Sequence, residues 1–215
     1  METKIAQALL NIGAIGFKPA QPLTFKSGII SPMHCDNRIF PAHPVDWKQV
    51  LEGFKNLIEK EKIEFDVIAG IESAGIPHSA ALGFLLGKPS VFCRKAIKDH
   101  GTKKMVEGGD VTGKTALLIE DLVTTGSSSL EGVKSLRDCG AMVNDCLVIF
   151  SYEFPESKKA FADAKVKLHS LTDFQTLLTE AVKLKKITEA QRQSVDDWHQ
   201  EPWGWAKRHG FSGGK

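Results

Sequence analysis

Residues 117–128 (LLIEDLVTTGSS) place two acids and a run of hydroxyl side chains directly after an apolar stretch. The apolar residues predict a strand that ends at Glu120 and Asp121, and the Thr/Gly/Ser loop that follows opens a helix. Ligands of an open α/β sheet bind at the carboxyl ends of its strands. Hydroxyl groups and free backbone N–H groups at a helix N-terminus bind phosphate, and neighbouring carboxylates bind sugar hydroxyls or help to place Mg²⁺. The stretch therefore predicts a site for a phosphorylated sugar, with an ordinary serine-capped turn as the alternative.

A second stretch, residues 108–115 (GGDVTGKT), matches the nucleotide-binding pattern G-x-x-x-x-G-K-[ST]. That loop must follow a buried strand and open a helix, because it binds phosphate with the helix N-terminus. Here the preceding residues are polar and glycine-rich, and the following residues, TALLIEDL, form a strand-like run. We therefore expect Gly113 to make a tight turn and Lys114 to start a strand, and we reject the nucleotide-binding reading.

The elements that must position these residues alternate along the chain. Apolar periodicity and glycine stops predict an α/β fold with a central, mostly parallel sheet flanked by helices. Helices are predicted at 3–12, 44–61, 78–87, 127–140, 155–164, 172–184 and 187–200, and strands at 65–70, 89–94, 115–121, 142–152 and 166–171.

Domain organisation follows from the same patterns. We expect a single domain over residues 1–215, with an N-terminal hood of short strands and turns at about 1–40 and a core at about 44–170. C-terminal helices and a tail occupy about 171–215. The tail, EPWGWAKRHGFSGGK, has no period that predicts an element.

Composition excludes several classes of protein. Apolar residues make up 42% of the 215 residues and charged residues 25%, which is typical of a chain with a packed core. A net charge of +2 does not favour nucleic acid as a partner. The longest apolar runs, such as residues 80–86, are too short to span a membrane, and the N-terminus lacks a secretory pattern, so we expect a cytoplasmic protein. The four cysteines form no C-x-x-C pair and are expected to be reduced thiols.

Residues 117–128 resemble the phosphoribosyl-pyrophosphate (PRPP) signature of the type I phosphoribosyltransferases, in which a hydrophobic strand and two acids precede a Thr/Gly-rich phosphate loop. The resemblance implies that family's fold with a small N-terminal hood. It also implies a PRPP site made by Glu120, Asp121, Leu122, Val123, Thr124, Thr125, Gly126, Ser127 and Ser128.

Residues 93–101 (CRKAIKDHG) resemble the mobile catalytic loop of the orotate phosphoribosyltransferases, R-K-x-x-K-x-H-G. A solvated basic loop is the alternative. The resemblance implies that the loop closes over the pyrophosphate, often in the neighbouring subunit's site, and excludes water. The residues that it assigns to pyrophosphate are Arg94, Lys95, Lys98 and His100.

Two further stretches are similar to the same enzymes. LTFKSG at 23–28, with SP at 31–32 and DNR at 36–38, resembles their hood, where Lys26 would reach PRPP and backbone groups would read the pyrimidine. A surface hairpin is the alternative. AGIESAGIP at 69–77 resembles their pyrophosphate loop, here made by Glu72, Ser73, Ala74 and Gly75.

Taken together, the four motifs imply an orotate phosphoribosyltransferase, which converts orotate and PRPP into orotidine 5′-monophosphate and pyrophosphate in pyrimidine (UMP) biosynthesis. The implied catalytic residues are Lys98, His100, Arg94 and Asp121. The implied cofactor is Mg²⁺, held mainly by PRPP rather than by protein ligands, and the implied assembly is a homodimer. Two alternatives stay open: a purine or xanthine phosphoribosyltransferase, and a non-catalytic regulator that binds PRPP.

One departure from the family concerns the orotate carboxylate. Some members carry an arginine just after the strand that corresponds to 142–152, whereas this chain has Ser151-Tyr152-Glu153-Phe154. We therefore expect Thr124 and hood backbone groups to bind orotate, with Lys26 or Arg38 supplying positive charge.

Overall fold

The computed structural model describes residues 1–25, 27–94 and 105–211. Its helices are α1 (Glu2–Asn11), α2 (Pro44–Glu61), α3 (Gly75–Leu86), α4 (Ser127–Asp138), α5 (Pro155–Asp163), α6 (Phe174–Lys183), α7 (Glu189–Gln200) and α8 (Pro202–Arg208), with a 3₁₀ helix, η1 (Asn37–Ala42). Its strands are β1 (Ile15–Phe17), β2 (Leu23–Thr24), β3 (Ile30–Ser31), β4 (Met33–Cys35), β5 (Val67–Ile71), β6 (Ser90–Cys93), β7 (Val106–Glu107), β8 (Ala116–Val123), β9 (Asp145–Ser151) and β10 (Lys167–Asp173).

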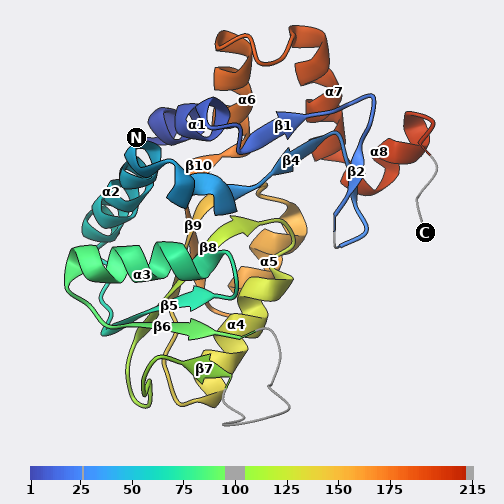
Figure 1. Cartoon of the computed structure of the whole chain (residues 1–215). Coiled ribbons are helices and arrows are strands. Elements are labelled where there is room, and N and C mark those ends of the chain that lie inside the picture. The colour runs from blue at the N-terminus through green and yellow to red at the C-terminus, as the bar shows by residue number, and fades with distance from the viewer. Residues whose placement is uncertain (26, 95–104, 212–215) are drawn as a thin grey trace.

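A six-stranded sheet of order β10-β9-β8-β5-β6-β7 forms the core, and every neighbouring pair is parallel except β6 and β7 (Figure 1). All five residues of β5 are buried, as are six of the seven in β9. Strands this apolar need cover on both faces, and the sheet has it. The predicted α/β fold with a mostly parallel sheet flanked by helices is therefore confirmed.

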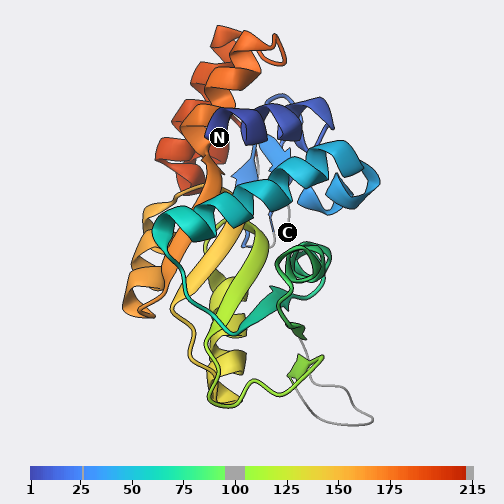
Figure 2. The same ribbon diagram turned by 90° about the vertical axis from the view of Figure 1, so that its left-hand side faces the viewer.

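The two faces of the sheet have separate apolar cores. Buried side chains of α1, α2, α3, α6 and α7 form one core with the sheet, and those of α4 and α5 contribute to the other. Figure 2 shows α2 and α3 on one side of the strands and α4 on the other. Because the strands are parallel, the carboxyl ends of β5, β6, β8 and β9 all meet at one edge, where the loops that follow them come together.

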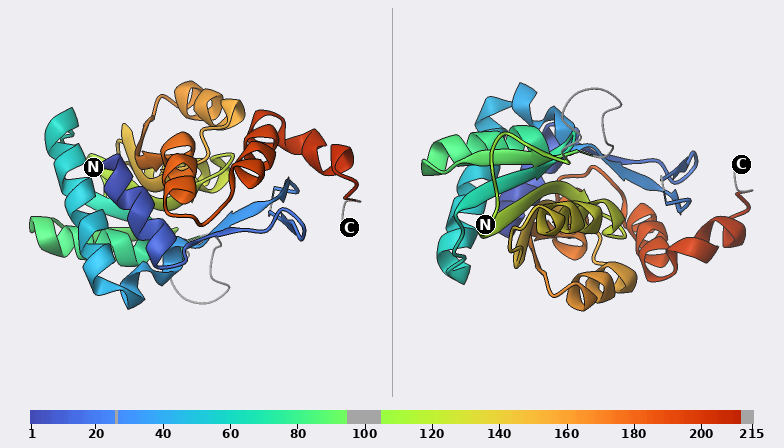
Figure 3. Two further views of the ribbon diagram at one scale, coloured as in Figure 1. Left: turned by 90° about the horizontal axis from the view of Figure 1, so that it is seen from above. Right: turned by 90° about the horizontal axis from the view of Figure 1, so that it is seen from below.

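The hood is built from two small antiparallel sheets. Ile15 of β1 pairs with Cys35 of β4, and the β2–β3 hairpin pairs Leu23 with Ser31. The short strands and turns expected in the N-terminal region are therefore present. The hood lies over the carboxyl edge of the central sheet, and its hairpin runs beside α8 in both views of Figure 3.

Several element boundaries differ from the sequence-based expectation. Helix α3 begins at Gly75 rather than at residue 78, directly at the predicted pyrophosphate loop. Strand β8 continues to Val123, so Glu120 and Asp121 lie within it rather than at its end. Strand β9 begins at Asp145, because Met142 makes only an isolated bridge, with Thr115.

The tail contains a helix that periodicity did not predict. Helix α8 spans seven residues, begins with Pro202 at its first turn and buries Trp205 completely. Seven residues with a glycine among them are too few to show an apolar period, and so short a helix is stable only through its tertiary contacts. Its neighbour β3 supplies such contacts, which ties the tail to the hood.

Candidate active site

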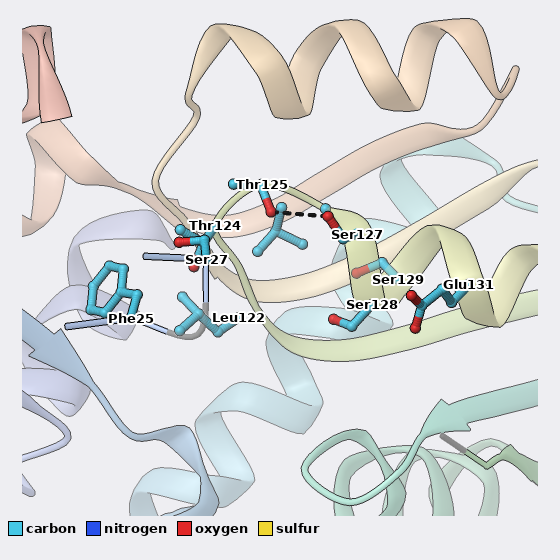
Figure 4. Close-up of a pocket in the computed structure, with 11 residues that line it drawn as sticks. Phe25, Ser27, Leu122, Thr124, Thr125, Ser127, Ser128, Ser129 and Glu131 are labelled. Carbon is cyan, nitrogen blue, oxygen red and sulfur yellow. Dashed lines mark hydrogen bonds between the residues drawn. The ribbon is translucent and has the colours of Figure 1, made fainter. Parts of the chain in front are cut away.

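The predicted phosphate loop lies between β8 and α4, as expected. Gly126 adopts φ +85°, a conformation that favours glycine, and a Cβ atom there would lie 2.9 Å from the Phe161 ring. The Thr125 and Ser127 hydroxyls lie 3.2 Å apart and are hydrogen-bonded (Figure 4). The loop therefore presents hydroxyl groups beside the N-terminus of α4, which is the arrangement that binds phosphate.

A cavity of about 340 Å³ opens at this loop. Figure 4 shows hood residues Phe25 and Ser27 at one end of it and α4 residues at the other. Its described lining consists of Phe25, Ser27, Leu122, Val123, Thr124, Thr125, Gly126, Ser127, Ser128, Ser129 and Glu131. None of these side chains is cationic, so among the described lining residues only hydroxyls and backbone N–H groups can bind an anion.

The two acids of the signature are neighbours on β8 and interact with each other: Glu120 Oε1 accepts a hydrogen bond from the Asp121 backbone N–H at 3.1 Å. Glu120 is 4% exposed and lies on the α4 side, where its Oε2 accepts a hydrogen bond from Ser128 Oγ at 3.4 Å. Burial raises the pKa of Asp121. The negative charge of Asp121 in turn raises the pKa values of Cys35 and Arg38 in the hood. Glu120 therefore contacts the phosphate loop through Ser128, and Asp121 lies close enough to the hood to affect the pKa values of Cys35 and Arg38.

Asn37, which was given no role from the sequence, connects the hood to strand β8 by a hydrogen bond. Asn37 is fully buried, and its Nδ2 donates to the Asp121 carbonyl oxygen at 2.6 Å. Its Oδ1 accepts a hydrogen bond from the Cys35 thiol at 3.1 Å. These bonds hold η1 against β8 and thereby set the distance between the hood and the acids.

Arg38, one of the expected orotate contacts, is paired within the hood. Its Nε and Nη2 donate to the two carboxylate oxygens of Asp36 at 2.6 and 2.8 Å. The hydrogen bonds from Arg38 lower the pKa of Asp36. Lys26, the other expected cation, lies outside the described residues. In the stretch just after β9, where the sequence analysis noted the lack of an arginine, Glu153 forms an ion pair with Lys158 at 3.3 Å.

The predicted pyrophosphate loop joins β5 to α3, and the peptide bond between Glu72 and Ser73 is cis. Two glycines allow the close packing around it. A Cβ atom at Gly70 would lie 2.8 Å from the Gly75 carbonyl oxygen, and one at Gly75 would lie 2.5 Å from the Ile119 carbonyl oxygen. Contacts this short exclude any side chain, so the loop lies directly against β8 beside the acids.

The predicted catalytic loop connects β6 to β7. Arg94 is described: its Nη1 donates to Glu107 Oε1 at 2.7 Å, and its backbone N–H donates to the Met105 carbonyl at 2.9 Å. The loop therefore starts from a closed antiparallel pair of strands at the carboxyl edge of the sheet. Lys95, Lys98 and His100 lie outside the described residues, and their assignment stays a prediction.

The rejected nucleotide-binding match lies at the other edge of the sheet. Gly113 adopts φ +71° in a turn, and Lys114 Nζ donates to the Asp110 carbonyl at 2.7 Å just before β8 begins. This geometry confirms that residues 108–115 lead into a strand and do not open a helix.

Comparisons with known proteins agree with this arrangement. Residues 46–175 match the phosphoribosyl transferase domain family. An orotate phosphoribosyltransferase of Coxiella burnetii is 40% identical over 203 residues, which cover 94% of this chain and 97% of that protein. The chain belongs to the orotate phosphoribosyltransferase family.

Solved structures show the same fold. An orotate phosphoribosyltransferase from Aeropyrum pernix superposes with a TM-score of 0.74 at 25% identity, covering 85% of this chain and 99% of that one. A UMP synthase from Leishmania donovani superposes with a TM-score of 0.82 at 24% identity, covering 93% of this chain and 42% of that longer one. This confirms the type I phosphoribosyltransferase fold.

Several residues that line the cavity were not predicted from the sequence. Phe25 and Ser27 flank the expected Lys26 and line the cavity, and Ser129 and Glu131 extend the lining one turn into α4. Their adjacency to quoted motif residues was the available signal. In the part of the chain that the structure describes, no group of three or more His, Cys, Asp or Glu side chains is placed to hold a metal ion. No helix there is long and apolar enough to cross a membrane.

Proposed function

We propose that this chain transfers the phosphoribosyl group of PRPP to orotate, giving orotidine 5′-monophosphate and pyrophosphate. The observation that carries the proposal is the 40% identity with an orotate phosphoribosyltransferase over nearly the whole of both chains. The site agrees with it, because a hydroxyl-lined loop at a helix N-terminus lies beside the buried Glu120, the half-buried Asp121 and the hood. The purine and regulator alternatives have no such support.

The reaction breaks the bond between ribose C1 and the pyrophosphate oxygen and forms a bond from C1 to a ring nitrogen of orotate. The proton of that nitrogen is released to the departing pyrophosphate or to water. Positive charge develops on the ribose ring while negative charge grows on the departing pyrophosphate. No protein nucleophile is required. The protein contributes orientation of the two substrates and electrostatic stabilisation of the charges that develop.

We assign the residue roles from the resemblance to the family, and the geometry of the described residues supports them. The loop Thr124–Ser128 binds the 5′-phosphate, and Glu120 and Asp121 bind the ribose hydroxyls from the strand that precedes it. The loop Glu72–Gly75, against the same strand, faces the pyrophosphate. Arg94, Lys95, Lys98 and His100 neutralise the leaving group when their loop closes, with His100 donating a proton or a hydrogen bond.

Orotate binds between the hood and Thr124 in this proposal. Lys26 and Arg38 supply the positive charge that its carboxylate needs. Arg38 must share its charge with Asp36, to which it is bound at 2.6 and 2.8 Å, so Lys26 carries more of this role.

Three further assignments belong to the same proposal. Mg²⁺ is the cofactor, bound mainly through PRPP oxygens, and supplies charge neutralisation at the pyrophosphate. The enzyme acts as a homodimer in which each catalytic loop serves the partner's site. The exposed side chains of Phe84 and Leu85 on α3, 93% and 49% accessible, support an apolar interface, and sedimentation velocity would test it. The protein works in the cytoplasm.

The test is to mix the purified protein with PRPP and Mg²⁺ and to follow the loss of near-ultraviolet absorbance of orotate. Parallel reactions contain uracil, adenine, hypoxanthine or xanthine, and one orotate reaction contains EDTA. The proposal expects Mg²⁺-dependent turnover with orotate alone. Turnover of a purine instead would overturn the substrate assignment, and PRPP binding without turnover of any base would favour the regulator.

A further inference from the structure

One wall of the cavity is formed by the β2–β3 hairpin of the hood, whereas the other lining residues come from β8, the phosphate loop and α4. Phe25 and Ser27 at its turn line the cavity, and Gly28 completes the turn with φ +92°. An isolated two-stranded hairpin is marginally stable in water, and each strand here has two residues. The position of this wall must therefore be set by what packs behind it.

Helix α7 packs behind it through Trp198. The indole Nε1 donates to the carbonyl oxygen of Ile30 on β3 at 2.9 Å, joining residues that are 168 positions apart. The same indole contacts the edge of the Phe25 ring, with centroids 6.1 Å apart, and that of Tyr152 at 5.4 Å. Trp198 is fully buried and Ile30 is half-buried, so the indole side of this hydrogen bond is shielded from water.

Trp198 is itself held firmly to the core. His199, the next residue of α7, lies 2.5 Å from the Tyr152 carbonyl oxygen through its Nε2. Its ring stacks on that of Phe174, with centroids 3.9 Å apart. Helix α7 is therefore fixed to the end of β9 on one side and to the hairpin on the other.

Helix α8 makes a second contact with the hairpin, at its tip, through Trp203. The Trp203 ring would lie 3.9 Å from a Cβ atom at Gly28, and its Nε1 donates to Glu156 Oε1 on α5 at 3.1 Å. Figure 3 shows α8 and the hairpin side by side. The Trp203 side chain is 59% exposed, so its contact with the hairpin stabilises the hairpin less than the buried contact of Trp198 does.

We propose that Trp198, assisted by Trp203, is a positioning residue for orotate binding: it holds the hairpin wall at the spacing from the phosphate loop that the base requires. The inference rests on the proposed function. Neither tryptophan lines the cavity among the described residues, so both act through the hairpin. PRPP is bound mostly by loops of the central sheet, so loosening the wall affects orotate more than PRPP.

The test is steady-state kinetics of Trp198→Phe and Trp203→Ala beside the unmodified enzyme. Trp198→Phe keeps an aromatic ring but loses the hydrogen bond to Ile30. We expect the orotate KM to rise about 3- to 10-fold, the range that one lost hydrogen bond corresponds to, and the PRPP KM to change less than about twofold. Trp203→Ala, at a position that is 59% exposed, should raise the orotate KM by about 2- to 3-fold.

Trp205→Phe is the matched control. Trp205 is buried in α8, and its indole nitrogen has no hydrogen-bond partner among the described residues, so the same exchange removes no such bond. Its orotate KM should stay within about twofold of the unmodified value. Equal changes in both KM values for Trp198→Phe, or a lower melting temperature with unchanged KM values, would overturn the inference. If Trp198→Phe does not fold, Trp203→Ala decides by the same criterion. An inactive unmodified enzyme would instead count against the proposed function.

Discussion

Replacing Gly75 by alanine tests the pyrophosphate loop most directly. The new Cβ atom would lie 2.5 Å from the Ile119 carbonyl oxygen on β8, whereas ordinary contacts begin at 3.4 Å. The obstacle is backbone in the centre of the sheet and cannot turn away as a side chain could. The start of α3 must therefore move away from β8 by about 0.9 Å, the difference between the two distances.

Two magnitudes follow from this displacement. Overpacking of this kind costs about 1–3 kcal/mol of unfolding free energy, which lowers the melting temperature of a chain of this size by about 2–12 °C. A misplacement of about 1 Å in a positioning group costs about 10²-fold in rate. We therefore expect kcat/KM for PRPP to fall about 100-fold in Gly75→Ala, which is far more than the loss of stability explains at 25 °C.

The assay is orotate consumption at 25 °C together with thermal unfolding. Gly83→Ala is the matched control, because it lies in the same helix and its Cβ would lie 3.0 Å from the Lys88 carbonyl oxygen, at the end remote from the loop. Gly83→Ala should lose stability but keep its activity. If Gly75→Ala unfolds at a lower temperature yet retains its kcat/KM for PRPP, the loop does not hold the pyrophosphate.

The remaining predictions concern one buried base and two cations. Burial lowers the pKa of His78 from 6.5, its value in the unfolded chain, to about 4 in the folded protein. Between pH 6.5 and pH 4 the unfolded state therefore binds more protons than the folded state, and the free energy of unfolding decreases as the pH falls. Urea unfolding should show a loss of about 2 kcal/mol from pH 7 to pH 5 that is smaller in His78→Gln; an equal loss in both would assign the effect to other groups. Lys98→Ala should lower kcat by about 10²- to 10³-fold and weaken PRPP binding, and near-normal turnover would refute the catalytic-loop assignment. Arg38→Ala should raise the orotate KM far more than the PRPP KM in the same assay; equal effects, or none, would remove Arg38 from carboxylate binding.

Local patterns in the sequence determined the order and type of most elements and the place of the main motifs. Continuous apolar strands such as β5 and β9 can be stable only between two layers of helices, so their composition already implied a buried parallel sheet. The phosphate loop was predictable because its chemistry lies in consecutive residues, Thr124 to Ser128, directly after a strand.

Only the tertiary structure decided what lies opposite these motifs. Asn37 and Asp121 are 84 positions apart, and Trp198 and Ile30 are 168 apart, and no local period relates such partners. Helix α8 belongs to the same group, since seven residues show no period and the helix depends on contacts with the hood. The partners of each acid also required the fold, because Ser128 of α4 and Arg38 of the hood reach β8 only through tertiary packing. The sequence therefore determines the groups that do the chemistry, and packing between distant segments determines the walls that hold them in place.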